Sequence, residues 1–456
     1  MTLRDPSDGR KMPPNGNDFV AAHCTRGVRK VTASLWNAYV RKCKPDIVVA
    51  LSDTPFTPPP HSQKRLTKSI ERSIAWLTSI LKVPAPARDG PADSRPRHVL
   101  VQLAGGTNPQ ARAEFSDRLT DPVEHRDAAD LEPFNTLDDG VAGYVFDLLP
   151  LRSALCADAG SPIDEGDLAG GLLRVSDRHR SSPKSSSHLA ELLRSSLEVL
   201  PAEKPRVLNS PVSPQEVLRL VRDVGIDLVD SSWAQRAADI GIALDFRFPV
   251  PSEDATPPAF NCVRLRTRKG GKSDLGHNLF DSAYVHDHFR LASSFIDGQS
   301  AVSLGIDTAH AAVCECGACS PRAPATRILH SDVDTQAWQD PSCRTTPSAL
   351  QPAFTRAYVH HLLHTHEMSA HALLAMHNIS VFSAFLEGIR ETIARGGEEG
   401  FTHEVARFEE AYDEDLALWA AAESMWIEVE RARGKGRLAR EKDKQKESTI
   451  GTAVYI

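Results

Sequence analysis

"KPRVLNSPVSPQEVLRLVRDVGIDLVDSSW", residues 204–233, contains the repeating unit of the fold in one stretch. Residues 206–210 and 225–232 are short apolar runs bounded by turn residues, a pattern typical of buried strands. Between them, Ser213 and the proline after it precede apolar residues at helical spacing, which end at Gly225. A serine cap, a proline in the first turn and a terminal glycine are signals of helix ends. The stretch therefore predicts a strand, a helix and a second strand.

The same alternation extends toward the N-terminus. Further strand-like runs occupy residues 46–53, 98–106 and 143–149, and a helical pattern covers residues 62–81. Continuous apolar strands that alternate with helices indicate a parallel sheet covered by helices. No glycine-rich dinucleotide or phosphate fingerprint follows any of these strands, which favours a barrel over an open sheet. We therefore expect an α/β protein with a TIM (β/α)8-type barrel.

Composition excludes several classes of protein. The 456 residues carry a net charge of −7, so an overall electrostatic attraction to nucleic acid is not expected. No run approaches eighteen consecutive apolar residues, and residues 1–17 lack the apolar core of a signal peptide. Eight cysteines in such a chain do not suggest a disulfide framework. We expect a cytoplasmic protein without an integral membrane segment.

Shifts in composition divide the chain into five parts. We expect a disordered N-terminus (1–18), the barrel core (19–250), an insertion and connecting segment (251–304), a zinc-binding helical subdomain (305–430) and a basic tail (431–456). Within that tail, residues 431–446 hold eight Lys and Arg against Glu441 and Asp443. The excess of positive charge fits either a solvated tail or an arm that contacts phosphates.

A cysteine cluster is the strongest candidate for a metal site. Cys314, Cys316 and Cys319 form a C-x-C-x2-C motif, and one tight turn can present such thiolates to a single zinc ion. A tetrahedral site needs a fourth ligand, and no fourth cysteine lies nearby. Six histidines follow in the next helical region: His360, His361, His364, His366, His371 and His377. Spacing alone leaves all six open.

Residues 354–393, which begin "FTRAYVHHLL", resemble the zinc-binding end of the tRNA-guanine transglycosylase family. In that family a C-x-C-x2-C motif is followed by a similar helix and an "HN" pair. The resemblance implies one structural zinc ion held by Cys314, Cys316, Cys319 and His377. Here 57 residues separate Cys319 from His377, more than is usual in the family, and a loop can absorb the excess at small entropic cost.

The resemblance covers residues 20 to 395 with gaps and is greatest to the non-catalytic subunits of the family. It implies a TIM barrel with a zinc subdomain. It further implies a heterodimer with a catalytic queuine tRNA-ribosyltransferase subunit, which exchanges guanine for queuine at the wobble position of tRNAs with GUN anticodons. Contact with tRNA would be made through that complex. Cytoplasmic location, with possible peripheral association with the mitochondrial outer membrane, follows from the same resemblance.

Asp230 occupies the position of the nucleophile in catalytic members, but its surroundings differ. The "P-T-R" that follows in those members is replaced by residues 234–236, "AQR", and the base-cradling loop is replaced by "DLLPLR", residues 147–152. The "D-S-G-G-F-Q" motif, which carries the proton-transfer Asp, is not found in the sequence. Its position would lie upstream of residue 20, so we expect a barrel that lacks its first strands. Asp230 is then expected to cap a loop or a helix.

These departures predict a non-catalytic subunit. Four protein ligands would leave no open position on zinc for an activated water, which makes the zinc structural. One alternative is an active transglycosylase that uses Asp230 as its nucleophile. Another is a zinc-dependent RNA-binding scaffold without a transglycosylase partner.

Overall fold

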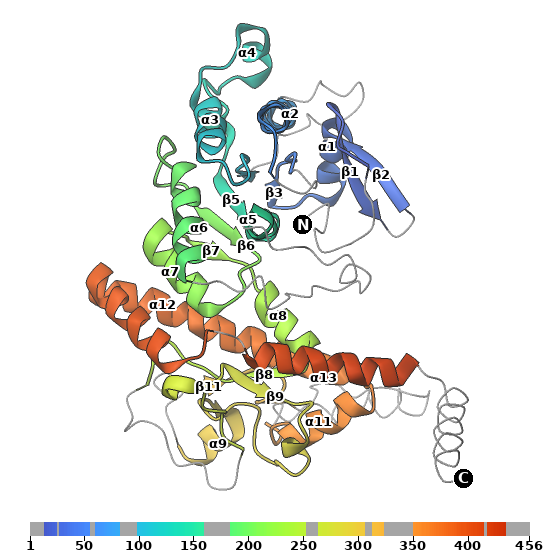
Figure 1. Cartoon of the computed structure of the whole chain (residues 1–456), viewed down its shortest axis with the longest axis vertical. Coiled ribbons are helices and arrows are strands. Elements are labelled where there is room, and N and C mark those ends of the chain that lie inside the picture. The colour runs from blue at the N-terminus through green and yellow to red at the C-terminus, as the bar shows by residue number, and fades with distance from the viewer. Residues whose placement is uncertain are drawn as a thin grey trace, which may run out of the picture. The chain divides into compact units, whose positions relative to one another are not determined.

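The computed structural model describes residues 13–24, 27–54, 60–82, 98–158, 183–251, 263–305, 312–322, 350–414 and 417–434. The chain forms two compact units, residues 1–232 and 233–456, which are treated separately below (Figure 1). The predicted basic tail from residue 435 onward lies outside the described residues. The five-part division of the chain remains a prediction.

The first unit contains a five-stranded parallel sheet. Its strands are β3 (Ile47–Val49), β4 (His98–Gln102), β5 (Gly143–Asp147), β6 (Arg206–Asn209) and β7 (Leu228–Val229). They pair in the order β3-β4-β5-β6-β7, with Val48 opposite Val99 and Val145 opposite Val207. The predicted strands are confirmed, but each is shorter than its apolar run, because residues at one or both ends of the run lie in a connecting segment or in the next helix.

Helices connect these strands, and a hairpin precedes them. The helices are α1 (Ala33–Cys43), α2 (Gln63–Leu81), α3 (Pro109–Thr120), α4 (His125–Leu131), α5 (Leu148–Asp158), α6 (Pro183–Ser195) and α7 (Pro214–Val224), and the hairpin is β1 (Phe19–Cys24) with β2 (Gly27–Thr32). Contacts run from α1 to α2, α2 to α3, α3 to α6 and α6 to α7. Strands that pair in chain order under neighbouring helices are arranged as in a (β/α) barrel, without the reversal of a doubly wound sheet. Among the described residues, no pairing closes the sheet.

Helix α7 forms as its sequence predicts. The Ser213 hydroxyl accepts a hydrogen bond from the backbone N–H of Glu216, 3.1 Å away, and Gly225 ends the helix with a φ of 73°. Both features satisfy backbone groups that a helix end would otherwise leave unpaired. The Glu216 carboxylate accepts two hydrogen bonds from Arg152 of α5, so the side chain also ties neighbouring elements together.

The second unit is built from helices around short strands. It contains α8 (Ser232–Asp239), β8 (Ile242–Leu244), β9 (Gly276–Asn278), β10 (Ile296–Asp297), α9 (Gly298–Ser303), β11 (Val313–Cys314), α11 (Arg356–His364), α12 (Met368–Ala411) and α13 (Ala417–Gly434). Strands β8 and β9 pair antiparallel, and β10 and β11 pair parallel. Aromatic rings fill the core, where Trp233 stacks on Trp419 with centroids 5.4 Å apart and Phe246 packs edge-on against Phe385.

The helices near the histidines differ in part from their predicted limits. The helical pattern that contains these histidines predicts one helix from about Thr355 to Met376, but α11 ends at His364, and His366 adopts a φ of 60° before α12 begins. Such a left-handed residue ends the helical hydrogen bonding. The glycine pair at residues 396–397 predicts a helix end. The structure has a break inside α12 there, where Gly397 has a φ of 59° and a ψ of −157°.

Among the described helices, α12 alone is long and apolar enough to cross a membrane, judged by its length and composition. Half of the most apolar 18-residue stretch of this helix is buried inside the protein. Residues Leu374, Val381 and Phe385 of the helix all belong to the core. Burial of this kind is typical of a core helix in a folded unit.

Gly388 marks a close approach of α12 to the chain. A Cβ at this position would lie 1.8 Å from the carbonyl oxygen of Phe248, whereas a Cβ at Gly396 meets nothing within 4 Å. Gly388→Ala should therefore lower the free energy of unfolding by about 1 to 3 kcal/mol through overpacking. Gly396→Ala should leave it unchanged or raise it by about 0.5 to 1 kcal/mol, because alanine favours the helix. Urea denaturation of both variants measures the difference, and equal midpoints would contradict the close approach.

Candidate metal centre

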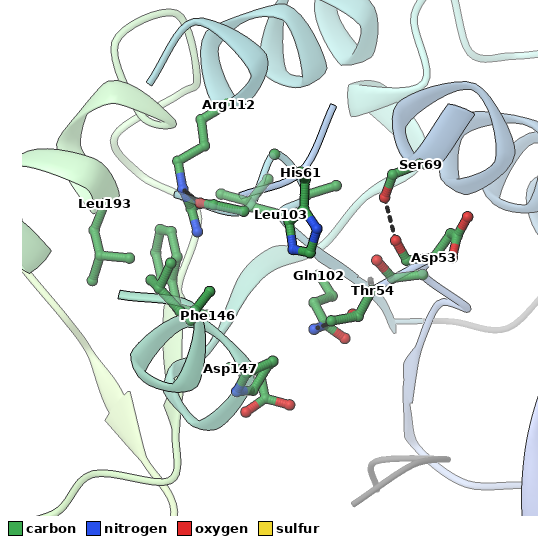
Figure 2. Close-up of a pocket in the computed structure, with 17 residues that line it drawn as sticks. Asp53, Thr54, His61, Ser69, Gln102, Leu103, Arg112, Phe146, Asp147 and Leu193 are labelled. Atoms are coloured by element: carbon green, nitrogen blue, oxygen red, sulfur yellow. Dashed lines mark hydrogen bonds between the residues drawn. The ribbon is translucent and has the colours of Figure 1, made fainter. Parts of the chain in front are cut away.

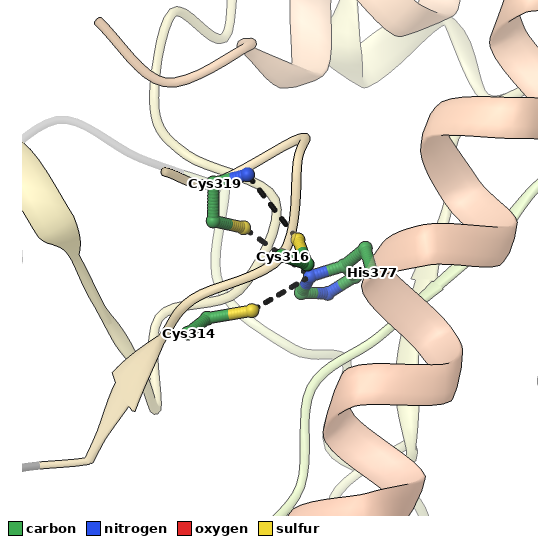
Figure 3. A group of neighbouring side chains, drawn as sticks. All are labelled: Cys314, Cys316, Cys319 and His377. Carbon is green, nitrogen blue, oxygen red and sulfur yellow. Dashed lines mark hydrogen bonds between the residues drawn. The ribbon is translucent and has the colours of Figure 1, made fainter. Parts of the chain in front are cut away.

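Two elements of the second unit bring four metal-binding side chains together (Figure 3). Strand β11 and the turn after it carry Cys314, Cys316 and Cys319, and α12 presents His377 to them. The three sulfurs and one imidazole nitrogen all lie within 4.8 Å of one another. The Nδ1 atom of His377 is 3.3 Å from the Cys319 sulfur and 3.7 Å from the Cys314 sulfur. Four soft or borderline ligand atoms at this spacing fit a tetrahedral divalent cation.

The histidine is fixed by backbone on the far side of its ring. Its Nε2 atom donates a hydrogen bond to the carbonyl oxygen of Leu244 in β8, 2.9 Å away. The side chain of Asn378, the next residue, donates to Ile242 and accepts from the Leu244 N–H, so the "HN" pair docks on one strand. Because Nε2 carries the proton, Nδ1 remains for the cluster.

Hydrogen bonds also shape the cysteine turn. The Ser320 hydroxyl donates to the carbonyl oxygen of Cys314 at 2.6 Å and accepts from the Gly298 N–H at 2.8 Å, which ties the turn to α9. The backbone N–H of Cys319 donates to the Cys316 sulfur at 3.3 Å. A donor aimed at sulfur stabilises a thiolate, the form that binds metal.

The protonation of the cluster reflects its crowding. Hydrogen bonds from the thiols of Cys316 and Cys319 hold the pKa of Cys314 far below its usual range, and the same contact with Cys314 raises the pKa of Cys319. Burial lowers the pKa of His377, but hydrogen bonds and attraction from the sulfurs of Cys314 and Cys316 outweigh it and raise the pKa to about 10. A divalent cation would release these shared protons and replace them with four coordinate bonds.

Among the described residues, the other five candidate histidines lie outside this cluster. The rings of His360 and His364 lie against the carbonyl oxygens of Leu279 and Phe280, at 2.8 and 3.1 Å. The Nδ1 atom of His371 lies 3.1 Å from the carbonyl oxygen of Ala238. The structure thus brings together the four residues that the family resemblance implied, a choice that spacing alone left open.

Asp230 lies at the end of β7 in the first unit, and both of its carboxylate oxygens are engaged locally. One oxygen accepts from the N–H and hydroxyl of Ser232, at 3.0 and 2.6 Å, and the other accepts from the Ser210 N–H at 2.8 Å. These bonds join the ends of β6 and β7 and cap the start of α8. They are the contacts expected of a structural aspartate.

The sequence did not single out two further acids at strand ends. Asp53, after β3, is buried, and its carboxylate accepts hydrogen bonds from Asn15, Arg65 and Arg72 at 2.7 to 3.0 Å. Asp147 ends β5, and burial, reinforced by the charge of Asp230, raises its pKa to about 6. Position at the end of an apolar run was the one signal that could have identified both residues.

Comparison with known proteins places these features in a family. Residues 11–128 and 156–411 match the family described as queuine tRNA-ribosyltransferase. The chain is 25% identical over 405 residues to queuine tRNA-ribosyltransferase accessory subunit 2 of Schizosaccharomyces pombe, which covers 87% of this chain and 60% of that protein. Proteins of the same name from Drosophila mojavensis and Ixodes scapularis are each 25% identical, over 86% and 78% of this chain.

The chain spans 60 to 67% of the length of these three relatives. The matched residues include strands β3, β4, β6 and β7 of the first unit, the cysteine turn and all of α12. With more than half of its residues matched, the chain belongs to the queuine tRNA-ribosyltransferase family.

Proposed function

We propose that this chain is a non-catalytic subunit of a heterodimeric queuine tRNA-ribosyltransferase. It would pair with a catalytic subunit and support the exchange of guanine for queuine at the wobble position of tRNAs with GUN anticodons. The observation that carries the proposal is the match to accessory subunit 2 along 78 to 87% of the chain in three relatives. Cytoplasmic location, with possible peripheral association with the mitochondrial outer membrane, is part of the same proposal.

The contacts of the carboxylates support a non-catalytic role. Base exchange needs one carboxylate as nucleophile and another for proton transfer, each with lone pairs free to reach substrate. Both carboxylate oxygens of Asp230 accept hydrogen bonds, from Ser210 and Ser232. The charge of Asp53 is neutralised by Arg65 and Arg72. A nucleophile with this many local donors is stabilised as a ground-state anion and is correspondingly less reactive.

The metal in this proposal is one structural zinc ion, held by Cys314, Cys316, Cys319 and His377. The ligand set supports zinc, because three sulfurs and one imidazole nitrogen suit its tetrahedral geometry. With all four positions taken by protein, the ion would fix the turn after β11 to α12. The sheet of the first unit would form part of a (β/α)8 barrel, a proposal that its strand order supports.

Exchange assays with labelled guanine test the catalytic assignment. The purified chain alone should show no exchange into tRNA, and addition of the catalytic subunit should produce activity and a complex of equal stoichiometry. Asp230→Asn should leave the activity of the complex within about twofold, because its side chain has a structural role at the ends of β6 and β7 and the start of α8. Asp121→Asn, at the exposed end of α3, is the matched control.

Two outcomes would overturn the proposal. Exchange by the chain alone that Asp230→Asn abolishes would establish an active transglycosylase. Failure of the chain to co-purify with any catalytic subunit, with tRNA still bound, would favour the zinc-dependent RNA-binding scaffold.

A further inference from the structure

A small cavity opens in the first unit beyond the ends of β3, β4 and β5 (Figure 2). Its volume is about 50 Å³, room for about three or four water molecules or one small oxyanion. Residues at the strand ends and just beyond them form most of its wall, including Thr54, Gln102 and Asp147, and Arg112 of α3 reaches it from the side. The carboxyl ends of parallel strands are where ligands of α/β proteins bind.

Arg112 is the unusual member of this wall. Its side chain is only 4% exposed, and among the described residues no carboxylate forms an ion pair with it. Burial alone lowers its pKa to about 10. Other buried guanidinium groups of this chain do have acids, since Arg152 pairs with Glu216 and Arg356 with Asp287. A buried cation without a counter-ion is costly, which indicates that an anion is to be supplied from outside the described residues.

Local contacts hold the guanidinium in place. Its Nε atom donates to the carbonyl oxygen of Gly106 at 2.8 Å, and its Nη1 atom donates to the Ser196 hydroxyl at 2.9 Å. The third nitrogen, Nη2, has no acceptor in the part of the chain that the structure describes. Nε and Nη1 are held by these bonds, so the guanidinium is fixed at the wall of the cavity and Nη2 is available as a donor to a ligand there.

The loop after β4 is shaped to fit this arginine. Gly105 has a φ of 114°, and a Cβ there would lie 2.6 Å from the backbone nitrogen and 2.7 Å from the Cγ of Arg112. Glycine is therefore required for the loop to lie against the side chain. The Gly106 carbonyl can then reach Nε, so the backbone geometry and the position of the guanidinium depend on each other.

Two acids also line the cavity. Asp53 has its charge balanced by Arg65 and Arg72, which leaves it little attraction for Arg112. Asp147 faces the cavity from the end of β5, and burial raises its pKa to about 6. The amide of Gln102 lies beside the Thr54 hydroxyl on the same wall and adds neutral donors.

We propose that this cavity is a binding site for a small oxyanion, the phosphate or carboxylate group of a small molecule, with Arg112 as its principal ligand. A guanidinium presents paired donors that match phosphate and carboxylate oxygens. The site is separate from the cysteine cluster, which lies in the other unit of the chain. It adds to the proposed function and does not depend on it.

Titration of the zinc-loaded full chain with inorganic phosphate tests the site. Binding is followed by phosphorus NMR line broadening at constant ionic strength, and acetate is titrated in a parallel arm by calorimetry. We expect saturable binding with one phosphate or one acetate per chain, and the tighter of the two identifies the preferred oxyanion. Arg112→Lys should weaken that binding at least tenfold. Arg118→Lys, on the exposed side of α3 beside Glu114, should change it less than twofold.

A second variant keeps the test decisive if Arg112→Lys does not fold. Gln102→Glu keeps the shape of the wall but places a carboxylate in the cavity, which should pair with Arg112 and abolish oxyanion binding. Absence of saturable binding in the wild-type chain would show that Arg112 finds its counter-ion within the chain. Equal affinity in wild type and in folded Arg112→Lys and Gln102→Glu would indicate an adventitious ion only. Either result overturns the proposal.

Discussion

Cys316→Ser is expected to lose the proposed zinc ion and to release α12 from the turn after β11. A serine hydroxyl is a hard, protonated group and a poor substitute for a thiolate. The remaining ligands, Cys314, Cys319 and His377, would keep three sulfur and nitrogen atoms crowded within 4.8 Å without the fourth bond. Structural zinc contributes about 10 to 16 kcal/mol of apparent binding energy in zinc-finger peptides, so the loss should exceed any other single change proposed for this chain.

Zinc content by mass spectrometry should fall from one ion to less than about a tenth of an ion per chain in this variant. Limited proteolysis should then cut in α11 and near the start of α12, which the wild-type protein protects. Cys43→Ser is the matched control, because Cys43 is an exposed free thiol at the end of α1. Retention of one zinc ion and an unchanged urea midpoint in Cys316→Ser would refute the metal assignment.

Two single histidine variants test which imidazole is the fourth ligand of the proposed zinc site. His377→Ala should lose zinc as Cys316→Ser does, whereas His361→Ala, in α11, should retain it. Cobalt substitution adds a readout that folding alone does not move, since tetrahedral cobalt bound to thiolates has strong visible absorption. Loss of these bands in His361→Ala and their persistence in His377→Ala would reverse the assignment.

Arg356→Met is expected to give the second-largest loss. Arg356 is fully buried, and its guanidinium donates to the carbonyl oxygens of Val263 and Leu291 and to the Asp287 carboxylate, at 2.7 to 3.2 Å. Its Nη2 atom also lies 2.8 Å from the ring of His277. Methionine would fill much of the volume but would leave the buried Asp287 carboxylate without its counter-charge, with the backbone N–H groups of Val263 and Phe289 as its remaining donors. Removal of one partner of a buried ion pair costs about 3 to 5 kcal/mol.

A second buried acid increases this effect. Burial raises the pKa of Asp245, but hydrogen bonds from His277, Ser293 and Ser294 outweigh it and hold that pKa well below its usual range. The carboxylate is therefore charged, and Arg356 lies 3.7 Å from it. Without the arginine, one positive charge is missing from a pocket that holds two carboxylates.

Urea denaturation in excess zinc, followed by tryptophan fluorescence, measures the loss for Arg356→Met. Trp233 and Trp419 stack in the core of the same unit and report on its unfolding. Arg390→Met is the matched control, because Arg390 pairs with Glu387 on the exposed face of α12 and its loss should cost less than about 0.5 kcal/mol. A loss below about 1 kcal/mol for Arg356→Met would show that the buried charges are balanced without it.

Local patterns predicted the repeating elements of this chain. Ser213 and Gly225 end α7 as expected, and the apolar runs around them became strands of a parallel sheet. Such signals depend on residues within one or two turns of each other, so the sequence contains them completely. The glycine pair at residues 396–397 predicts the break at Gly397 for the same reason. The end of α11 near His366 could not be predicted, because no glycine or proline marks it.

The metal cluster shows how far local patterns reach. The C-x-C-x2-C motif by itself predicted three of the four clustered side chains, because the spacing places three sulfurs on one turn. The fourth depends on the carbonyl of Leu244, which orients the ring of His377 from 133 residues away. The family resemblance supplied this residue before the structure did, and the tertiary contacts give the physical reason for the choice.

The sequence by itself determined the strand–helix order, the cysteine turn and the set of candidate histidines. Only the tertiary structure decided that Asp230 and Asp53 have their oxygens occupied, and that the buried Arg112 forms no ion pair with a carboxylate among the described residues. Charge balance and hydrogen-bond saturation are properties of groups that meet in space. The periodicity of apolar residues along the chain therefore does not predict charge balance or hydrogen-bond saturation.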